Sequence, residues 1–140
     1  DQPWGHRADG SVVEPGPGDD NGPAMGPAGT VHLSLPDLVT YARWHLREAT
    51  PSPPLVTAVS LGRLHGVGQP DGYYGGWDRV ARDWARGQAL THTGTNTMFF
   101  AAVWLAPARD FGVLAVSNKG GPAAAQACDA ACAHLIQRRA

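Results

Sequence analysis

Between residues 72 and 118 the sequence alternates runs of strand-forming residues with brief turn segments. Residues 73–84 read as a strand with a glycine break, and three further strand-like runs cover 89–93, 97–107 and 111–118. The tetrapeptide Ala-Arg-Gly-Gln separates the first pair of runs, and Pro-Ala-Arg-Asp separates the last pair. Because strands joined by tight turns run in opposite directions, we predict one antiparallel sheet, in which residues 111–118 pair with residues 98–105.

Helical patterns flank the predicted sheet. Ser34 and Asp37 form an S-x-x-D capping pattern, and apolar residues recur at helical spacing from Leu38 onwards. This predicts a helix over about 35–48, ended by the prolines at 51, 53 and 54. A second, short helix is predicted within 55–65, with Gly66 as its stop signal.

The C-terminal residues predict a last helix over 122–138, opened by Pro122. Its small and apolar positions form a stripe that we expect to pack on the sheet: Ala124, Cys128, Ala131, Cys132 and Leu135. The resulting fold class is α+β, an antiparallel sheet with packed helices. We expect the helix over 35–48 to have different surroundings, reaching towards a region that this sequence does not contain.

Residues 1–29 are rich in Gly, Pro, Asp and Asn, which favour turns and oppose regular hydrogen-bonded structure. We therefore divide the chain into an extended segment, 1–29, and an α+β portion, 30–140. An irregular segment of 29 residues normally packs against another part of the protein. We expect it to lie on a surface supplied by another part of the protein.

Composition excludes several function classes. The chain has 140 residues, is 43% hydrophobic and carries a formal charge of -1, which suits one domain with a core. Its arginines are scattered, so no nucleic-acid partner is expected. The longest apolar run is about ten residues, too short for the roughly 20 that a membrane span needs. The opening residues Asp1-Gln2-Pro3 have neither the basic nor the apolar part of a signal peptide.

Common catalytic and metal motifs are also missing from the sequence. The six histidines show no H-x-x-x-H or H-E-x-x-H spacing, and no serine stands in a G-x-S-x-G elbow. The segment Gly-Pro-Gly-Asp-Asp-Asn-Gly lacks the Lys-Ser/Thr end of a phosphate-binding loop. Cys128 and Cys132 are interpreted as small core residues rather than a metal or redox pair. No cofactor and no metal are expected.

One polar stretch stands directly before the longest apolar run. His92-Thr93-Gly94-Thr95 at a strand edge resembles the third signature of the serine β-lactamase and penicillin-binding-protein superfamily, usually Lys-Thr-Gly. The His-Thr-Gly variant is familiar among class C-like members and DD-peptidases.

The surrounding segments resemble the same family in the same order. They are a Pro-Ala-Gly turn with a Ser-capped helix at 26–46, a Tyr-Gly-x-Gly-Trp-like strand at 73–80, and a signature strand, hairpin and closing Asn turn at 91–121. Residues 2–6 resemble a segment seen just upstream in the family. The resemblance covers roughly residues 24–137.

This resemblance implies roles for residues 92–96. Acyl transfer needs donors aimed at the developing oxyanion, and in this family the backbone N–H at the position of Thr95 is one of them. Gly94 would let substrate approach the strand closely, and Thr93 would offer its hydroxyl to a substrate carboxylate or carbonyl. His92 would replace the fixed positive charge of lysine with a side chain type that titrates near neutral pH. Asn96 is predicted as a substrate-binding neighbour, without a firm family role.

Two family motifs are missing. Lys119 is the single lysine and residue 116 is valine, so no Ser-x-x-Lys exists, and no tyrosine or serine is followed two residues later by asparagine. We therefore expect the chain to be the C-terminal half of a serine hydrolase that acts on an ester, amide or peptide through an acyl-enzyme. Its expected partners are the substrate and the N-terminal half of the same protein.

The chain alone should be inactive, and the family resemblance implies a periplasmic or secreted parent. One alternative is a non-catalytic, truncated ligand-binding module of the same fold. Another is an unrelated α+β domain with a fortuitous His-Thr-Gly.

Overall fold

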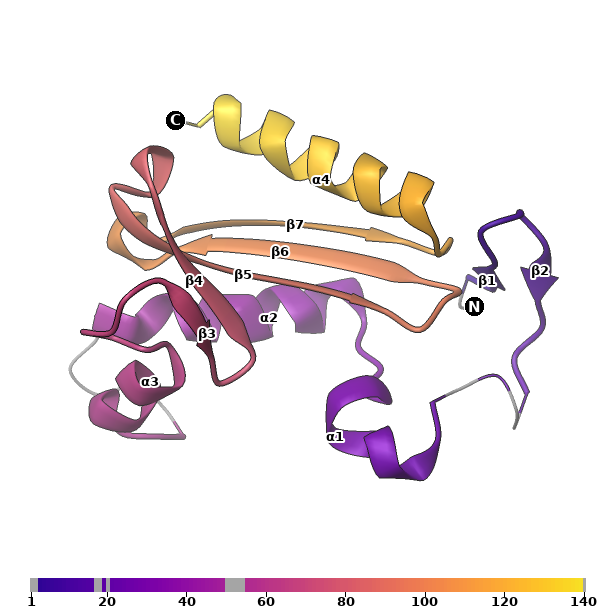
Figure 1. Ribbon diagram of the computed structural model, residues 1–140, viewed down its shortest axis with the longest axis horizontal. Helices are drawn as coiled ribbons and strands as arrows, with labels where there is room; N and C mark the ends of the chain where they lie inside the picture. Colours follow the sequence, from indigo (N-terminus) through magenta and orange to yellow (C-terminus); the bar gives the residue numbers. More distant parts are fainter. Residues whose placement is uncertain (1–2, 17–18, 20, 50–54, 140) are drawn as a thin grey trace.

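The computed structural model of the chain describes residues 3–16, 19, 21–49 and 55–139. Its centre is a five-stranded antiparallel sheet in the order β3-β4-β5-β6-β7, so each strand pairs with its neighbour in sequence (Figure 1). The strands are β3 Gly72–Tyr74, β4 Trp77–Arg82, β5 Gly87–Thr95, β6 Phe100–Ala106 and β7 Phe111–Ser117.

The pairing of β6 with β7 follows the predicted arrangement. It runs from Ala106 opposite Phe111 to Phe100 opposite Ser117, and Pro107–Arg109 form a 3-10 turn between the strands. Asp110 closes this turn with a positive φ of 47°, a conformation that Asp adopts more readily than most residues. The antiparallel α+β fold predicted from the sequence is confirmed.

The predicted helices on the N-terminal side are also present. Helix α2 spans Leu35–His45, and the Ser34 hydroxyl accepts a hydrogen bond from Asp37 N at 3.3 Å. A 3-10 turn, Leu46–Ala49, continues it. Helix α3 spans Ala58–Leu64. The three prolines expected to end the first helix lie outside the described residues.

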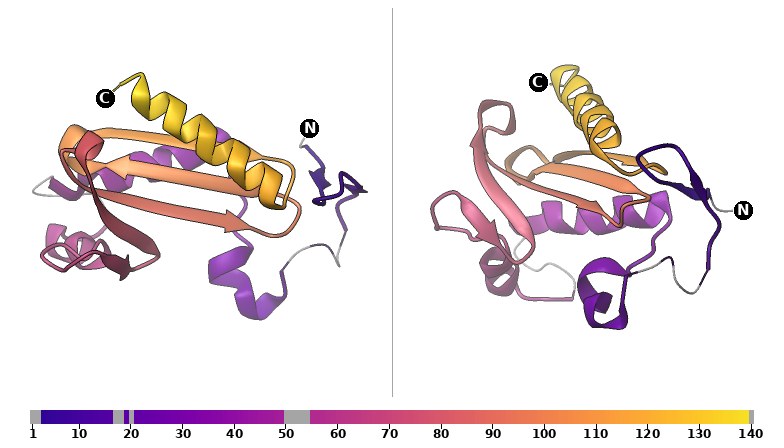
Figure 2. Two further views of the ribbon diagram at one scale, coloured as in Figure 1. Left: turned by 45° about the horizontal axis from the view of Figure 1, so that its top comes forward. Right: turned by 45° about the vertical axis from the view of Figure 1, so that its right-hand side comes forward.

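Two helices cover opposite faces of the sheet (Figure 2). Helix α4, Pro122–Gln137, lies along one face, where Cys128 and Cys132 pack with Ala102 of β6. Helix α2 lies on the other, where Ala42 packs with Leu105 of β6. The alternation of side chains along β6 sends even-numbered residues towards α4 and odd-numbered residues towards α2.

The buried stripe of α4 differs in part from the prediction. Its buried residues step by four along the helix: Ala124, Cys128, Cys132 and Ile136. Ala131 is exposed, and Leu135 is 42% exposed, so the prediction was wrong for these two positions. A four-residue step places Ile136, not Leu135, above the sheet.

Both cysteines are buried and free, which confirms their interpretation as core residues. Burial raises the pKa of the Cys132 thiol to about 11, with smaller contributions from Cys128 and Asp129. Because the thiolate is the reactive form, this thiol is a poor nucleophile at neutral pH.

The N-terminal segment is not uniformly extended. It contains the strand pair β1 Gly5–His6 and β2 Val12–Val13, followed by the 3-10 turn η1 Pro23–Met25 and the short helix α1 Gly26–Gly29. His6 N donates to Met98 O at 3.1 Å, and Gly120 N donates to His6 O at 2.9 Å. The start of the segment therefore lies against this chain's own sheet, where we had expected a surface from elsewhere in the protein.

Helix α2 does not bury its whole apolar surface. Ala42 of α2 and Leu46 of the 3-10 turn that follows are buried, whereas Leu35 is 50% exposed and Val39 and Tyr41 are also exposed. This agrees with the expected difference between α2 and α4. In the part of the chain that the structure describes, no helix has the length and apolar character required to span a bilayer.

Candidate functional site

The second half of β5 forms an open strand edge. Pairing with β4 extends only from Gly87 to Thr91, whereas pairing with β6 continues from Leu90 to Thr95. Residues 92–95 therefore have a strand partner on one side only, among the strands described. Because the backbone groups of a strand point alternately to its two sides, some N–H and C=O groups of 92–95 face away from β6 and are open to a ligand.

The predicted site residues occupy this edge together. His92, Thr93, Gly94 and Thr95 are all exposed. His92 stands opposite Val103 and Thr93 opposite Ala102, so their side chains leave the strand on opposite faces. A Cβ placed on Gly94 would meet no described atom within 4 Å, so there is free space beside the strand. The arrangement offers a backbone edge with a different side chain on each face.

Asn96 shapes the turn that follows. Its side-chain oxygen accepts hydrogen bonds from Phe99 N at 2.9 Å and Met98 N at 3.3 Å. The Thr95 hydroxyl donates to Phe99 O at 2.6 Å and accepts from Thr97 N at 3.0 Å. These bonds fix the end of the open edge. The role of Asn96 as a substrate-binding residue stays a prediction, since its oxygen already bonds within the turn.

Two glycines hold the N-terminal strand pair and the 118–120 segment against this turn. A Cβ on Gly5 would lie 2.8 Å from Met98 Cβ, and a Cβ on Gly120 would overlap the Thr97 carbonyl oxygen. The Asn118 side chain adds a hydrogen bond from its Nδ2 to Trp4 O at 3.0 Å. Close backbone contact therefore positions the loop at the end of the site.

We expect Gly120→Ala to lower the free energy of unfolding by about 2–3 kcal/mol, because the added methyl group has no space beside Thr97. Gly22→Ala is the matched control: a Cβ there meets no described atom within 4 Å, and its φ of -58° suits alanine. Urea unfolding of both variants measures the effect. Equal stabilities would contradict the tight contact.

A buried pair of histidines lies beneath the β3–β4 hairpin. His45 Nδ1 of α2 and His65 Nε2, just after α3, are 2.7 Å apart, and the side chain of His65 is fully buried. The rings of Tyr41, Trp44 and Trp77 lie 4.5–4.8 Å from the His45 ring, centroid to centroid. The pair joins α2, α3 and β4. No spacing in the sequence pointed to it.

Burial lowers the pKa of His45 to about 4, and the neighbouring His65 adds a smaller effect in the same direction. His45 is therefore neutral at physiological pH. Within the described ranges, no group of three His, Cys, Asp or Glu side chains is arranged to hold a metal ion.

A cavity of about 710 Å³ lies away from the open edge, between α2 and the β6–β7 turn. Ala42 of α2 and Leu46 of the following 3-10 turn line it on one side, and Leu105 and Phe111 line it from the strands. Its lining includes none of residues 92–96, so the cavity does not contribute to the predicted site.

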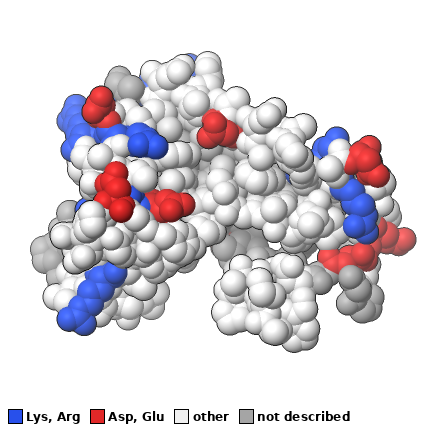
Figure 3. Space-filling view, in the orientation of Figure 1, with Lys and Arg blue, Asp and Glu red and all other residues white. Residues whose placement is uncertain are grey.

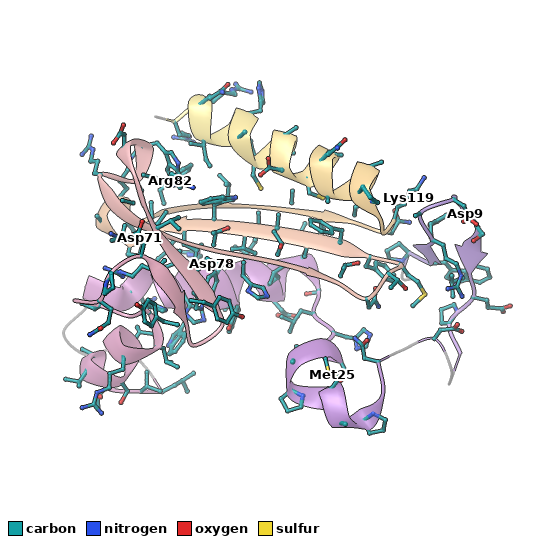
Figure 4. The ribbon with its side chains drawn as sticks, in the orientation of Figure 1. Asp9, Met25, Asp71, Asp78, Arg82 and Lys119 are labelled. Atoms are coloured by element: carbon teal, nitrogen blue, oxygen red, sulfur yellow. The ribbon has the colours of Figure 1, made fainter. Side chains whose placement is uncertain are left out.

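Charged side chains gather towards the two ends of the face in Figure 3, and most of its middle is uncharged. Asp71, Asp78 and Arg82 belong to the β3–β4 end, and Asp9 and Lys119 to the end with the N-terminal strands (Figure 4). Between them the open edge of β5 offers hydroxyl, imidazole and backbone groups rather than fixed charges.

Comparison with known proteins adds one finding. A family model described as Beta-lactamase matches residues 1–136 of the chain. No curated protein matches it.

Proposed function

The chain belongs to the serine β-lactamase and penicillin-binding-protein-like superfamily, and from this premise we propose that it carries one edge of a serine hydrolase active site. The reaction would be acyl transfer from an ester, amide or peptide through an acyl-enzyme. The observation that carries the proposal is the open edge of β5, which bears His92-Thr93-Gly94-Thr95 where β4 no longer pairs.

The groups at this edge suit the chemistry. The tetrahedral intermediate of acyl transfer needs N–H donors aimed at its oxyanion, and we assign the Thr95 backbone N–H to this part. Gly94 leaves room for the substrate to lie along the strand. The Thr93 hydroxyl and the His92 imidazole would then contact the substrate from the two faces of the strand.

We assign the nucleophile to a serine outside this chain. Three of its serines bond locally: Ser34 donates to the Asp37 carboxylate at 2.6 Å, Ser60 accepts from the Thr57 hydroxyl at 3.0 Å, and Ser117 accepts from Lys119 N at 3.1 Å. None belongs to a Ser-x-x-Lys motif. We infer that residues 30–140 form the C-terminal α+β portion of a larger catalytic domain, with residues 1–29 leading into it.

The exposed apolar residues of α2 support this inference. Leu35, Val39 and Tyr41 leave an apolar surface on the side of the sheet opposite α4. An N-terminal half that carries the serine and its lysine would bury this surface and bring the nucleophile to the same side as His92.

We expect the chain by itself to leave nitrocefin and p-nitrophenyl esters unhydrolysed and to resist labelling by a fluorescent penicillin, because it offers no activated serine to acylate. The comparison is a longer protein from the same gene that includes any upstream Ser-x-x-Lys. Mass spectrometry detects the acyl adduct. Stoichiometric labelling of a serine within these 140 residues would contradict the proposal.

The second candidate is a non-catalytic ligand-binding module of the same fold. The absence of Ser-x-x-Lys from this sequence is the observation that favours it. This second function predicts that a longer protein from the same gene also forms no acyl adduct, while small ligands still bind at the β5 edge.

A further inference from the structure

An exposed tyrosine stands beside the open edge of β5. Tyr73 of β3 is 60% exposed, and its ring centroid lies 6.1 Å from that of His92, with 41° between the ring planes. Tyr73 pairs with Asp78 across the hairpin, and Asp78 pairs with Thr91, the last residue of β5 that β4 reaches. The tyrosine therefore stands where the open edge begins.

The hairpin that carries Tyr73 is tightly fixed. Gly75 and Gly76 form its turn with φ values of 52° and 93°. A Cβ on Gly75 would lie 2.6 Å from the Leu64 carbonyl oxygen, so α3 packs directly against the turn. The Tyr74 hydroxyl donates to Pro70 O at 3.1 Å, and Trp77 is only 5% exposed. Residues 74–77 of the hairpin are thus constrained, although the ring of Tyr73 itself is solvent-exposed.

An exposed aromatic ring on a constrained hairpin has few rotatable bonds, so it loses little conformational entropy on binding, and it offers a large flat contact area. Aromatic groups that pack against such a ring gain about 0.5–1.5 kcal/mol beyond simple burial. The carboxylate of Asp78, in register with Tyr73, would repel an anionic group. The observations favour a planar ligand group without negative charge.

We propose that Tyr73 and His92 form a subsite that binds a planar substrate group without negative charge, such as an aromatic ring, beside the β5 edge. The identity of the bound molecule as a substrate rests on the proposed hydrolase function. Tyr73 acts here by direct contact with the bound group, and the subsite selects flat groups over saturated rings of similar size.

NMR titration with two neutral amides tests the subsite. Phenylacetamide and cyclohexylacetamide differ in the planarity of the ring, and both are expected to bind weakly, with Kd on the order of 1–10 mM. We expect the chain to bind phenylacetamide about three- to tenfold more tightly, with shifts in the Tyr73 and His92 ring signals. Tyr73→Phe should keep this preference, and Tyr73→Leu should abolish it.

The subsite would be overturned if the chain bound both amides equally well, or if Tyr73→Leu still preferred phenylacetamide. It would also be overturned if neither the Tyr73 nor the His92 ring signal shifted. Circular dichroism shows whether Tyr73→Leu is folded; if it is not, His92→Ala provides the second loss-of-preference variant. Because the titration needs no acylation, its result is separate from that of the penicillin-labelling experiment. Either proposal can fail while the other stands.

Discussion

In the larger hydrolase proposed above, replacing Thr95 with proline should lower kcat/KM by about 10²–10³-fold, the loss typical for removal of one oxyanion donor. Proline has no backbone N–H, and it is tolerated at strand edges where that group is not needed for pairing. Thr95 pairs only with β6, opposite Phe100. Hydrolysis of a p-nitrophenyl ester measures the effect, and circular dichroism shows whether the fold is kept.

The matched control is Thr95→Ser. Serine keeps the backbone N–H and a hydroxyl that can replace the bonds to Phe99 O and Thr97 N, so its activity should stay within about threefold of the original. Thr95→Ala is the second control, because it removes both turn bonds, as Thr95→Pro does, but keeps the backbone N–H. If the folded Thr95→Pro variant retained activity within the same threefold range, the N–H would not be an oxyanion donor.

Local signals in the sequence predicted most of the sheet. Alternating strand-forming residues and turn tetrapeptides specified β5, β6 and β7, because each strand pairs with its neighbour along the chain. The glycine break in residues 73–84 was harder to interpret. Gly75 and Gly76 both have positive φ, so the expected single strand is the hairpin of β3 and β4.

The features that sequence reasoning missed depend on contacts between distant residues. His45 and His65 are separated by 20 residues, and His6 pairs with Met98 and Gly120 across almost the whole chain. Tyr73 is also separated from His92 by the whole of β4. The His-Thr-Gly stretch was recognisable because its functional groups lie in consecutive residues. Tyr73, the other residue of the candidate subsite, comes from the β3–β4 hairpin.

The buried histidine pair should make the stability of the fold depend on pH. The pKa of His45 is lowered to about 4 in the folded chain, against about 6.5 for an unperturbed histidine. The unfolded chain therefore takes up a proton at His45 before the folded chain does. The stabilisation is fully present above about pH 6.5 and is lost as pH falls through this range to about 4, by about 3 kcal/mol in total.

Urea unfolding at a series of pH values between 7.5 and 4 measures this loss. Carboxylates also titrate in the lower part of the range. The test therefore compares how the free energy of unfolding changes with pH in the original chain and in each variant. His45→Phe keeps an aromatic ring among Tyr41, Trp44 and Trp77 but cannot take up a proton. We expect it to be less stable at pH 7.5, because His65 loses its partner at Nε2, and to show a shallower pH dependence.

His134→Gln is the control, because it removes an exposed histidine and should leave the pH dependence unchanged. If the unfolding free energy of His45→Phe depended on pH as steeply as that of the original chain, His45 would not be the source of this dependence. The expected slope has a direct structural consequence. Protonation of His45 would place a charge between α2, α3 and Trp77 of β4, and the β3–β4 hairpin that carries Tyr73 would loosen at acid pH before the α4 side of the sheet does.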